Sequence, residues 1–165
     1  MSERLLVPDP AGVSHASAAA LHGIGNRDAD VLEFTLAGRK QSRQADVRIH
    51  RGVIPQSDWT QVLGLPVTTL ARTVADLVAA GLDGGHLAGL ARDAIFSAGV
   101  DLQELGSRLA PFAARYGAPV GEDQAFVRRL LDEAGIPAAT EQLVQDRALD
   151  LLRQLYRQPN AGCRS

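Results

Sequence analysis

The side chains of this 165-residue chain that could do chemistry include a local group of basic residues and four histidines. Residues 39–51, the basic segment, hold five basic residues against one acid, Asp46. Guanidinium groups gathered at one end of a strand pair can hold phosphates through paired hydrogen bonds. Alternatively, charged side chains along a sheet edge only prevent aggregation. Both interpretations stay open. The candidate residues for binding nucleic acid or a partner are Arg39, Lys40, Arg43, Arg48 and Arg51.

Two of the histidines could share one helix face. His15 and His22 lie seven residues apart, which is about two helical turns. Two imidazoles without a third ligand rarely hold a metal, so we favour a partly buried pair that bonds near helix ends. Ser14 precedes His15, but neighbours on a helix point to different sides and a serine at this place is expected to cap the helix. The sequence therefore predicts no metal site and no nucleophile here.

Motifs of the common nucleotide-dependent enzymes are missing from the sequence. It contains no glycine-rich phosphate-binding loop. Lys40 is the only lysine, and no acid stands two residues before it as a PD-(D/E)xK nuclease would need. A nucleotidyltransferase needs Gly-Ser followed by Asp-x-Asp, but Gly106 and Ser107 lead to Arg108-Leu109-Ala110. We predict a protein that is not an enzyme and has no cofactor, metal or small-molecule substrate.

A second polar group follows Pro66 on a predicted helix. Arg72 and Asp76 stand four residues apart, and such a pair contributes about 0.3 kcal/mol when exposed. Their stripe lies opposite the apolar face of the helix. We favour a structural role that locks the helix to the strands, and a surface that faces a partner is the alternative. The stripe consists of Thr69, Arg72, Thr73 and Asp76.

Hydrophobic periodicity predicts the elements that must position these residues. Residues 31–36 and 45–50 have the alternation typical of strands and suggest a hairpin-like pair. A third short strand is predicted at residues 61–65, ended by Pro66, which cannot donate to a ladder. We predict an α+β fold with a small antiparallel sheet of two or three strands packed on a helical layer and a helix-rich C-terminal half.

Hydroxyl residues ahead of apolar runs predict helix starts at Ser14 and Thr68. Beyond Thr68 the apolar spacing is helical, with a capping residue at Asp101 and a left-handed helix end at Gly117. A last amphipathic helix is predicted from about residue 140 to residue 156. Packing on the domain is the favoured interpretation for it, and docking of a second chain is the alternative.

Composition bounds the class of protein. With 17 basic and 19 acidic side chains the net charge is −2, so no overall field favours nucleic acid or membranes. The single cysteine, Cys163, cannot form an internal disulfide. No stretch has the pattern of a signal peptide or the length of a membrane span. A cytoplasmic protein without a membrane partner is expected.

Several weak motifs arrive together along the chain: Ser14-His15-Ala16-Ser17-Ala18-Ala19, Arg48-Ile49-His50-Arg51-Gly52, Asp58-Trp59-Thr60, Gly64-Leu65-Pro66-Val67-Thr68-Thr69-Leu70-Ala71-Arg72-Thr73, Gly84–Gly89 and Leu109–Gly117. In type and order they resemble the C-terminal effector domain of AbiEi-family antitoxins, the regulators of type IV toxin-antitoxin systems that are paired with nucleotidyltransferase-like toxins. The resemblance covers residues 5 to 134. Such antitoxins usually carry a winged helix ahead of this region. The thirteen residues before Ser14 cannot hold one, so an effector module without its DNA-reading domain is expected.

The resemblance implies an antitoxin that opposes a nucleotidyltransferase-like toxin and retains at most a residual role in autoregulation of its operon. DNA binding is expected to be weak without a winged helix. One alternative is a nucleic-acid-binding transcriptional regulator that uses the basic segment, with an affinity that falls steeply with salt. Another is a non-enzymatic assembly module that uses the last helix. The predicted organisation is a connector at 1–13, an AbiEi-like domain at 14–117, a helical extension at 118–158 and a frayed tail at 159–165.

Overall fold

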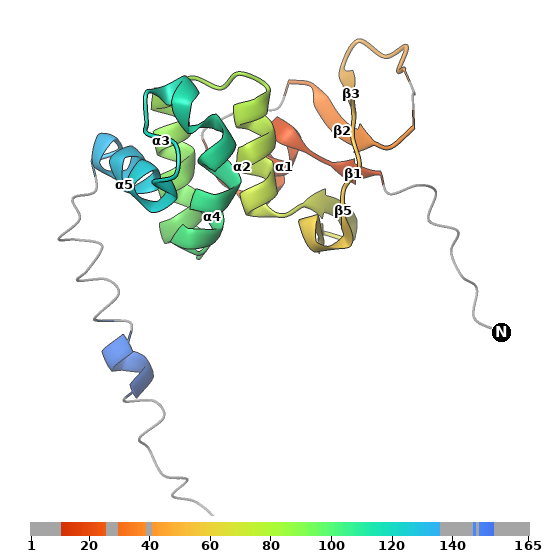
Figure 1. Ribbon diagram of the computed structural model, residues 1–165. Helices are drawn as coiled ribbons and strands as arrows, with labels where there is room; N and C mark the ends of the chain where they lie inside the picture. Colours follow the sequence, from red (N-terminus) through yellow and green to blue (C-terminus); the bar gives the residue numbers. More distant parts are fainter. Residues whose placement is uncertain (1–10, 26–29, 39–40, 136–146, 148, 154–165) are drawn as a thin grey trace, which may run out of the picture.

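The computed structural model describes residues 11–25, 30–38, 41–135, 147 and 149–153. These residues form an α+β fold with a twisted sheet on one side and helices on the other (Figure 1). Within the described ranges, no helix combines the length and the apolar character that a bilayer crossing requires. Residues 1–10 of the predicted connector and the predicted tail at 159–165 lie outside the described residues.

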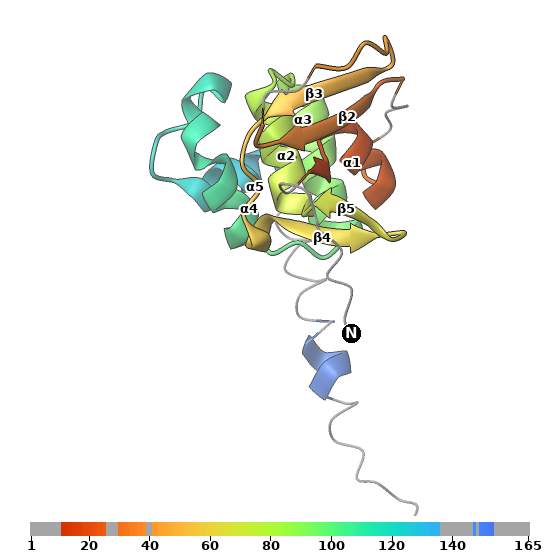
Figure 2. The same ribbon diagram turned by 90° about the vertical axis from the view of Figure 1, so that its right-hand side faces the viewer.

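The sheet has five strands within the described ranges, in the order β3-β2-β1-β5-β4. Figure 2 shows β3 and β2 at one side of the sheet and β5 and β4 at the other, with α2 and α3 behind it. Pairing is mixed: β2 is antiparallel to β1, and β4 is antiparallel to β5, while β1 with β5 and β2 with β3 run parallel. The strands are β1 (Gly12–Val13), β2 (Leu32–Leu36), β3 (Val47–Arg51), β4 (Trp59–Val62) and β5 (Leu65–Thr68).

The prediction of a small antiparallel sheet of two or three strands is therefore wrong. The segments at 31–36 and 45–50 are neighbours, but they pair in parallel and not as a hairpin. Residues 37–46 are long enough to carry the chain back to the starting end of β2, where the N–H of Leu32 donates to the carbonyl of Asp46 at 2.7 Å. Strand β1 could not be predicted because it has only two residues, which fall at the end of the predicted connector at 1–13. In the sheet it lies between β2 and β5.

The hairpin of β4 and β5 turns at Leu63 and Gly64. Both residues have positive φ values, +52° and +79°, as a tight two-residue hairpin turn requires. Pro66 pairs with Gln61 inside the hairpin and does not end a strand as predicted. Thr68 ends β5, and Thr69, not the predicted Thr68, holds the N-cap position of α2.

Five α-helices are assigned in the described part of the chain, and their apolar stripes agree with the predicted spacing. Asp101 begins one of them by accepting hydrogen bonds from the N–H groups of Gln103 and Glu104, at 2.9 and 3.0 Å. Gly117 has the predicted left-handed conformation, with φ at +68°. The helices are α1 (His15–His22), α2 (Leu70–Ala79), α3 (Gly84–Arg92), α4 (Leu102–Leu109) and α5 (Asp123–Glu133). Short turns of other helix types cover Gln56–Asp58, Asp93–Ser97 and Ala110–Tyr116.

The main hydrophobic core, here called the helical core, lies among α2, α3, α4 and α5. Burying one leucine or phenylalanine side chain contributes roughly 1.5–3 kcal/mol to folding. Helix α5, which lies within the predicted extension at 118–158, packs in this same core. The largest fully buried side chains of the helical core are Ile24, Leu87, Leu105, Leu109, Phe126, Leu130 and Leu131.

Part of the predicted last helix is described. Residues 147 and 149–153 include helical residues, and the rest of the predicted segment at 140–156 lies outside the described ranges. Leu149, Leu151 and Leu152 are each at least 50% exposed. These leucines are not buried as the favoured interpretation expected.

Candidate functional site

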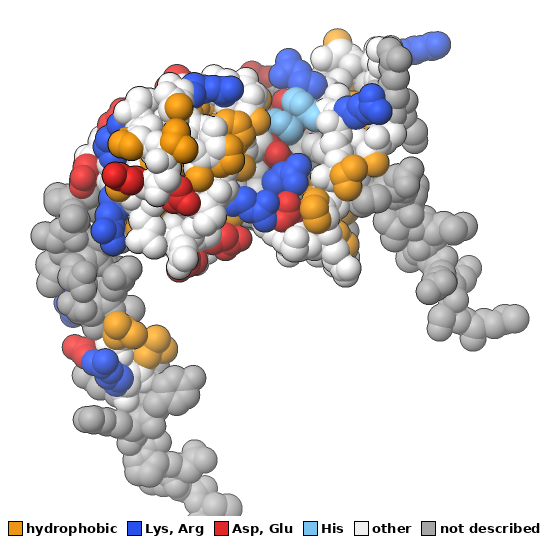
Figure 3. All heavy atoms as spheres, viewed as in Figure 1, with side chains coloured by type: hydrophobic (Ala, Val, Ile, Leu, Met, Phe, Trp, Pro, Cys, Tyr) orange, Lys and Arg blue, Asp and Glu red, His pale blue; other side chains and the backbone are white. Residues whose placement is uncertain are grey.

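Polar side chains gather in a hollow between the sheet and the helical half of the molecule, which we call the central cleft. Figure 3 shows histidine side chains in this hollow, with basic and acidic groups on its walls. Two adjoining cavities form the cleft, of about 280 and 350 Å³, and they share His15 and Ala80. The polar and charged residues lining the two cavities are His15, Asp30, Glu33, Thr35, Arg48, His50, Arg51, Arg72, Asp76 and Asp83.

The register of β2 and β3 places four of these residues on one face of the sheet. In this parallel pair, Glu33 lies beside Arg48 and Thr35 lies beside His50. Side chains of paired residues project to the same side of a sheet, and alternate residues share a face. The cleft wall therefore follows from the parallel pairing, and the predicted hairpin would have produced a different set of neighbours.

His15 and His50 form the centre of the cleft. Their rings stack with centroids 3.6 Å apart and an angle of 14° between the planes. His15 has a left-handed backbone, with φ at +53°. A side chain other than glycine in this conformation costs of order 1 kcal/mol, and such strain is concentrated at functional sites.

The left-handed backbone also changes what Ser14 does. Oγ of Ser14 lies 2.9 Å from Nδ1 of His15, so the prediction that these neighbours point to different sides is wrong. Ser14 holds the predicted N-cap position, but its side chain makes no capping bond. It accepts a hydrogen bond from Oγ1 of Thr35 at 2.8 Å instead. The hydroxyl hydrogen of Ser14 is then available to Nδ1 of His15. The pKa of His15 is lowered, chiefly by burial and secondly by the nearby His50, and this favours the neutral ring.

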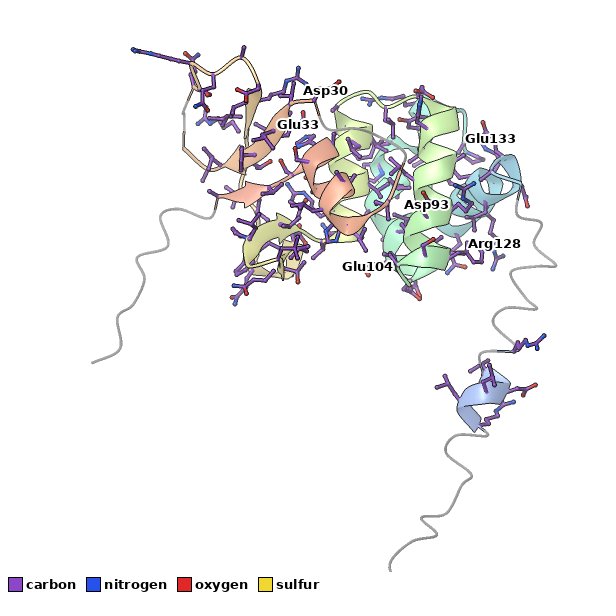
Figure 4. The ribbon with its side chains drawn as sticks, turned by 180° about the vertical axis from the view of Figure 1, so that it is seen from behind. Asp30, Glu33, Asp93, Glu104, Arg128 and Glu133 are labelled. Atoms are coloured by element: carbon purple, nitrogen blue, oxygen red, sulfur yellow. The ribbon has the colours of Figure 1, made fainter. Side chains whose placement is uncertain are left out.

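Glu33 supplies the helix cap that Ser14 does not. Its Oε2 accepts from the N–H of Ala16 at 2.9 Å, while Oε1 lies 3.1 Å from Nε2 of His50 and 3.4 Å from Nη1 of Arg48. Burial alone would raise the pKa of Glu33, but the Ala16 N–H and the contact with His50 outweigh it and bring the pKa below its ordinary value. Figure 4 shows Glu33 and Asp30 beside α1, away from the labelled charged residues of the helical half.

A buried carboxylate, Asp58, connects the cleft to the helices. It accepts from Nη1 of Arg72 and Nη1 of Arg108, each at 2.9 Å, and also pairs with Nη2 of Arg108. The hydrogen bonds from Arg108 are the largest cause of a lowered pKa at Asp58, which exceeds the opposing effect of burial. Arg72 thereby links α2 to the turn before β4 and, through Asp58, to α4.

The predicted polar stripe on α2 is for the most part structural. Nε of Arg72 donates to Oδ1 of Asp76 at 2.8 Å, which confirms the predicted ion pair. Thr73 is fully buried and donates to the carbonyl oxygen of Thr69 at 2.9 Å, so the stripe is not a continuous exposed surface. Within the stripe, Arg72 and Asp76 line the central cleft.

The structure separates the members of the basic segment. Arg39 and Lys40 lie outside the described residues. Arg43 is exposed and does not line either cavity, whereas Arg48 and Arg51 line the rim of the central cleft. The side chain of Arg48 is 63% exposed even though it approaches Glu33. Two of the five predicted basic residues, Arg48 and Arg51, therefore line cavities that His15 also lines.

His15 and His22 are buried and half-buried, and each makes a bond near a helix start, as the favoured interpretation expected. Nε2 of His22 lies 2.7 Å from the carbonyl oxygen of Thr68, a bond near the start of α2. His15 also meets His50 from a distant part of the chain. Within the described ranges, no three His, Cys, Asp or Glu side chains are grouped so that they could hold a metal ion.

Sequence reasoning missed four residues of this polar network as site residues: Glu33, Thr35, His50 and Asp58. Glu33 and Thr35 alternate within a strand that is otherwise apolar, and this is the signal that could have found them. His50 and Asp58 belong to stretches already quoted for the family resemblance. The place of His50 follows from the parallel pairing of β2 and β3, and that of Asp58 from its bonds to Arg72 and Arg108.

No family model matches the chain, and a search of curated proteins finds none that is similar to it.

Proposed function

We propose that this chain is the effector domain of a cytoplasmic antitoxin that opposes a nucleotidyltransferase-like toxin, and that it acts by binding through the central cleft. One observation carries the proposal. Separate stretches that resemble AbiEi-family antitoxins, although far apart in the sequence, contribute side chains that line the central cleft or bond to a residue that lines it. They contribute Ser14 and His15, then Arg48, His50 and Arg51, then Asp58, and finally Arg72.

The energetics of the cleft support a binding role for it. Buried ion pairs and strained backbone are weak sources of stability, because well-packed apolar residues would serve the fold equally well. The cleft is nevertheless lined by the buried carboxylate of Glu33 and by His15 with its left-handed backbone, and the buried carboxylate of Asp58 holds Arg72, which also lines the cleft. Groups that contribute little to stability and lie on one concave surface are typical of a site that meets a ligand or partner.

A binding role without catalysis agrees with the arrangement of the hydroxyl and imidazole groups. Ser14 is fully buried, so its hydroxyl has no access to a substrate in the cleft. His50 is held by the carboxylate of Glu33, and His15 is mostly buried between Ser14 and His50. A general base needs a free nitrogen within hydrogen-bonding reach of a reacting group.

The charges of the cleft favour a toxin-related role over sequence-specific recognition of DNA. Arg72 and Arg108 are neutralised by Asp58 and Asp76, which leaves Arg48 and Arg51 as the basic groups at the rim. A few phosphate contacts give only weak binding that falls with salt.

Growth rescue tests the proposal. The chain is co-expressed with a nucleotidyltransferase-like toxin, the partner that the proposal assigns to it, and we expect growth to be restored. His50→Ala should abolish the rescue, and Arg128→Ala on α5 is the matched control because Arg128 lies in the helical half. Soluble protein and circular dichroism confirm folding of each variant. Absence of rescue by the folded wild-type chain would contradict the antitoxin assignment.

A further inference from the structure

Strand β4 lies at one edge of the sheet and pairs on its inner side with β5 (Figure 2). Among the described residues, no strand pairs with its outer side. The N–H of Thr69 donates to the carbonyl oxygen of Asp58 at 2.9 Å, and bonded pairs alternate along this antiparallel ladder from that point. The N–H and C=O groups of Trp59 and Gln61 therefore face away from β5. Such an edge is a template for another strand.

The two edges of the sheet differ in charge. Strand β3, at the opposite edge, carries the exposed side chains of Arg48 and Arg51. Two copies pairing there would bring like charges together, and charged side chains commonly protect an edge from pairing. In contrast, residues 59–71 contain no charged side chain, so β4 meets no charge repulsion when it pairs with itself. The chain thus protects one edge by charge and leaves the other without this protection.

The turn beside the β4 edge adds exposed apolar side chains. Leu63, at the tip of the hairpin, is 87% exposed, and Leu65 is 46% exposed. Leu63 also has a left-handed backbone, with φ at +52°, which asparagine adopts more readily than leucine. In a single chain this leucine therefore combines backbone strain with apolar exposure. Both properties are what we expect of a side chain that a second surface covers.

These features define the strand that fits the edge. The outward N–H and C=O groups need an extended backbone, and the uncharged surroundings suit an uncharged strand. Strand β4 of a second copy meets both requirements. When two copies of β4 pair antiparallel with Thr60 opposite Thr60, Trp59 of each copy forms a hydrogen-bonded pair with Gln61 of the other. Threonine pairs across strands are favourable, and Leu63 of one copy then lies diagonally from Trp59 of the other, within reach of its ring.

We propose that two copies of this chain associate through β4, antiparallel about a two-fold axis beside Thr60, so that their sheets join into one. Closed two-fold dimers of this kind use the same surface on both subunits, which an edge that fits itself provides. The proposal goes beyond the antitoxin function and does not depend on it, because residues of β4 line neither cavity of the central cleft. Dimerisation and growth rescue are therefore separate results.

Sedimentation equilibrium of the full chain, from about 1 µM to about 1 mM, tests the proposal. We expect a reversible dimer with a dissociation constant in the micromolar range. Thr60→Lys places like charges opposite each other and should weaken the dimer about tenfold. The matched control, Gln124→Lys, adds the same charge at an exposed position on α5 and should associate as the wild type does. Leu63→Asn suits the left-handed backbone, so it should weaken the dimer without lowering the urea midpoint of unfolding.

A disulfide cross-link tests the register. Directly opposite residues of an antiparallel pair have Cβ atoms about 4.5 Å apart, which is close enough for a disulfide. Cys163, the single cysteine of the chain, is first replaced by serine. In that background Thr60→Cys should give a covalent dimer on mild oxidation, whereas Gln124→Cys should stay monomeric under denaturing, non-reducing conditions.

Three results would overturn the proposal. A monomer up to about 1 mM would show that a second copy does not occupy the edge, whether another segment or a different partner does. Equal dissociation constants for Thr60→Lys and Gln124→Lys, or equal cross-linking of the two cysteine variants, would place the dimer contact elsewhere. Circular dichroism confirms folding of each variant, and Thr60 is exposed, so its substitutions should keep the fold. If Thr60→Lys nevertheless unfolds, the cysteine variants decide the question.

Discussion

The helical core and the central cleft bury their side chains by different chemistry. In the helical core, α2, α3, α4 and α5 pack through leucine, valine and phenylalanine side chains, and several of these side chains have no solvent exposure. The cleft joins β2, β3, α1 and α2 through carboxylates, imidazoles and guanidinium groups. Apolar burial contributes directly to stability, whereas buried ion pairs contribute little net free energy. The difference is what we expect if the core maintains the fold and the cleft, as we propose, serves binding.

Truncation in the helical core should have the largest effect on stability. Leu109 is fully buried between the helices, so Leu109→Ala removes apolar contacts and leaves a cavity. The free energy of unfolding should fall by about 3 kcal/mol. Urea denaturation followed by circular dichroism measures it. A loss below about 1 kcal/mol would show that the helices are not held by this core.

Breaking the Asp58 cluster should have the next largest effect. Asp58→Asn leaves Arg72 and Arg108 without their shared carboxylate, and we expect a loss of about 2 kcal/mol because both arginines keep some solvent contact. Urea midpoints at neutral pH measure it. Asp132→Asn, which changes an exposed residue on α5, is the control. It should change the free energy of unfolding by less than about 0.5 kcal/mol, as most surface substitutions do.

The same cluster predicts how stability depends on pH. The pKa values of Asp58 and Glu33 are both lowered in the folded protein. Their stabilising contribution is therefore complete above the unfolded values of about 4 and is lost as the pH falls through the lowered values. Urea midpoints measured from pH 7 to pH 2 should decline below about pH 4, and Asp58→Asn should decline less. Equal declines in both proteins would contradict the role of Asp58.

His15→Gly should sharpen the comparison because its effects on stability and function differ. Glycine adopts the left-handed backbone without strain, while the change removes the stack on His50 and the contact with Ser14. The free energy of unfolding should change by less than about 1 kcal/mol, yet growth rescue should be lost. Rescue at the wild-type level would show that the paired imidazoles have no part in binding.

The smallest effect is expected in the turn of the basic segment. Replacing Arg39, Lys40 and Arg43 together by alanine should change stability by less than about 0.5 kcal/mol, because Arg43 is exposed, the sequence predicts a polar connection at 38–44, and surface charges contribute little. Wild-type binding to the operon promoter should be weak, sensitive to salt and indifferent to sequence, and the triple variant should bind less. Promoter and scrambled duplexes are compared at low and physiological salt. Tight discrimination of the promoter at physiological salt would contradict this prediction.

The helices could be predicted from the sequence because their information is local. The spacing of Val74, Leu77 and Val78 marks the buried face of α2, and Asp101 and Gly117 mark helix ends with side-chain and backbone requirements of their own. The sheet could not be predicted in the same way. A two-residue strand has no period to detect, and nothing in residues 37–46 distinguishes a hairpin from a return to the start of β2.

The candidate site depended on that nonlocal information. Glu33 and His50 meet only because β2 and β3 run parallel, and the imidazole stack exists only because His15 has a left-handed backbone. Of the predicted polar residues, Arg48, Arg51, Arg72 and Asp76 line the central cleft. Their residue types were recognisable in the sequence, whereas the strand pairing that places β3 and the packing that brings α2 to the same cleft were not.

The most direct test of the account measures growth rescue and unfolding free energy in the same pair of variants. Val127→Ala lies in the helical core and should lose about 2 kcal/mol, whereas His50→Ala lies in the central cleft and should lose about 1 kcal/mol or less. The account predicts that the less stable core variant still rescues growth and that the cleft variant does not. If rescue follows stability alone, so that His50→Ala rescues better than Val127→Ala, the central cleft is not the functional surface.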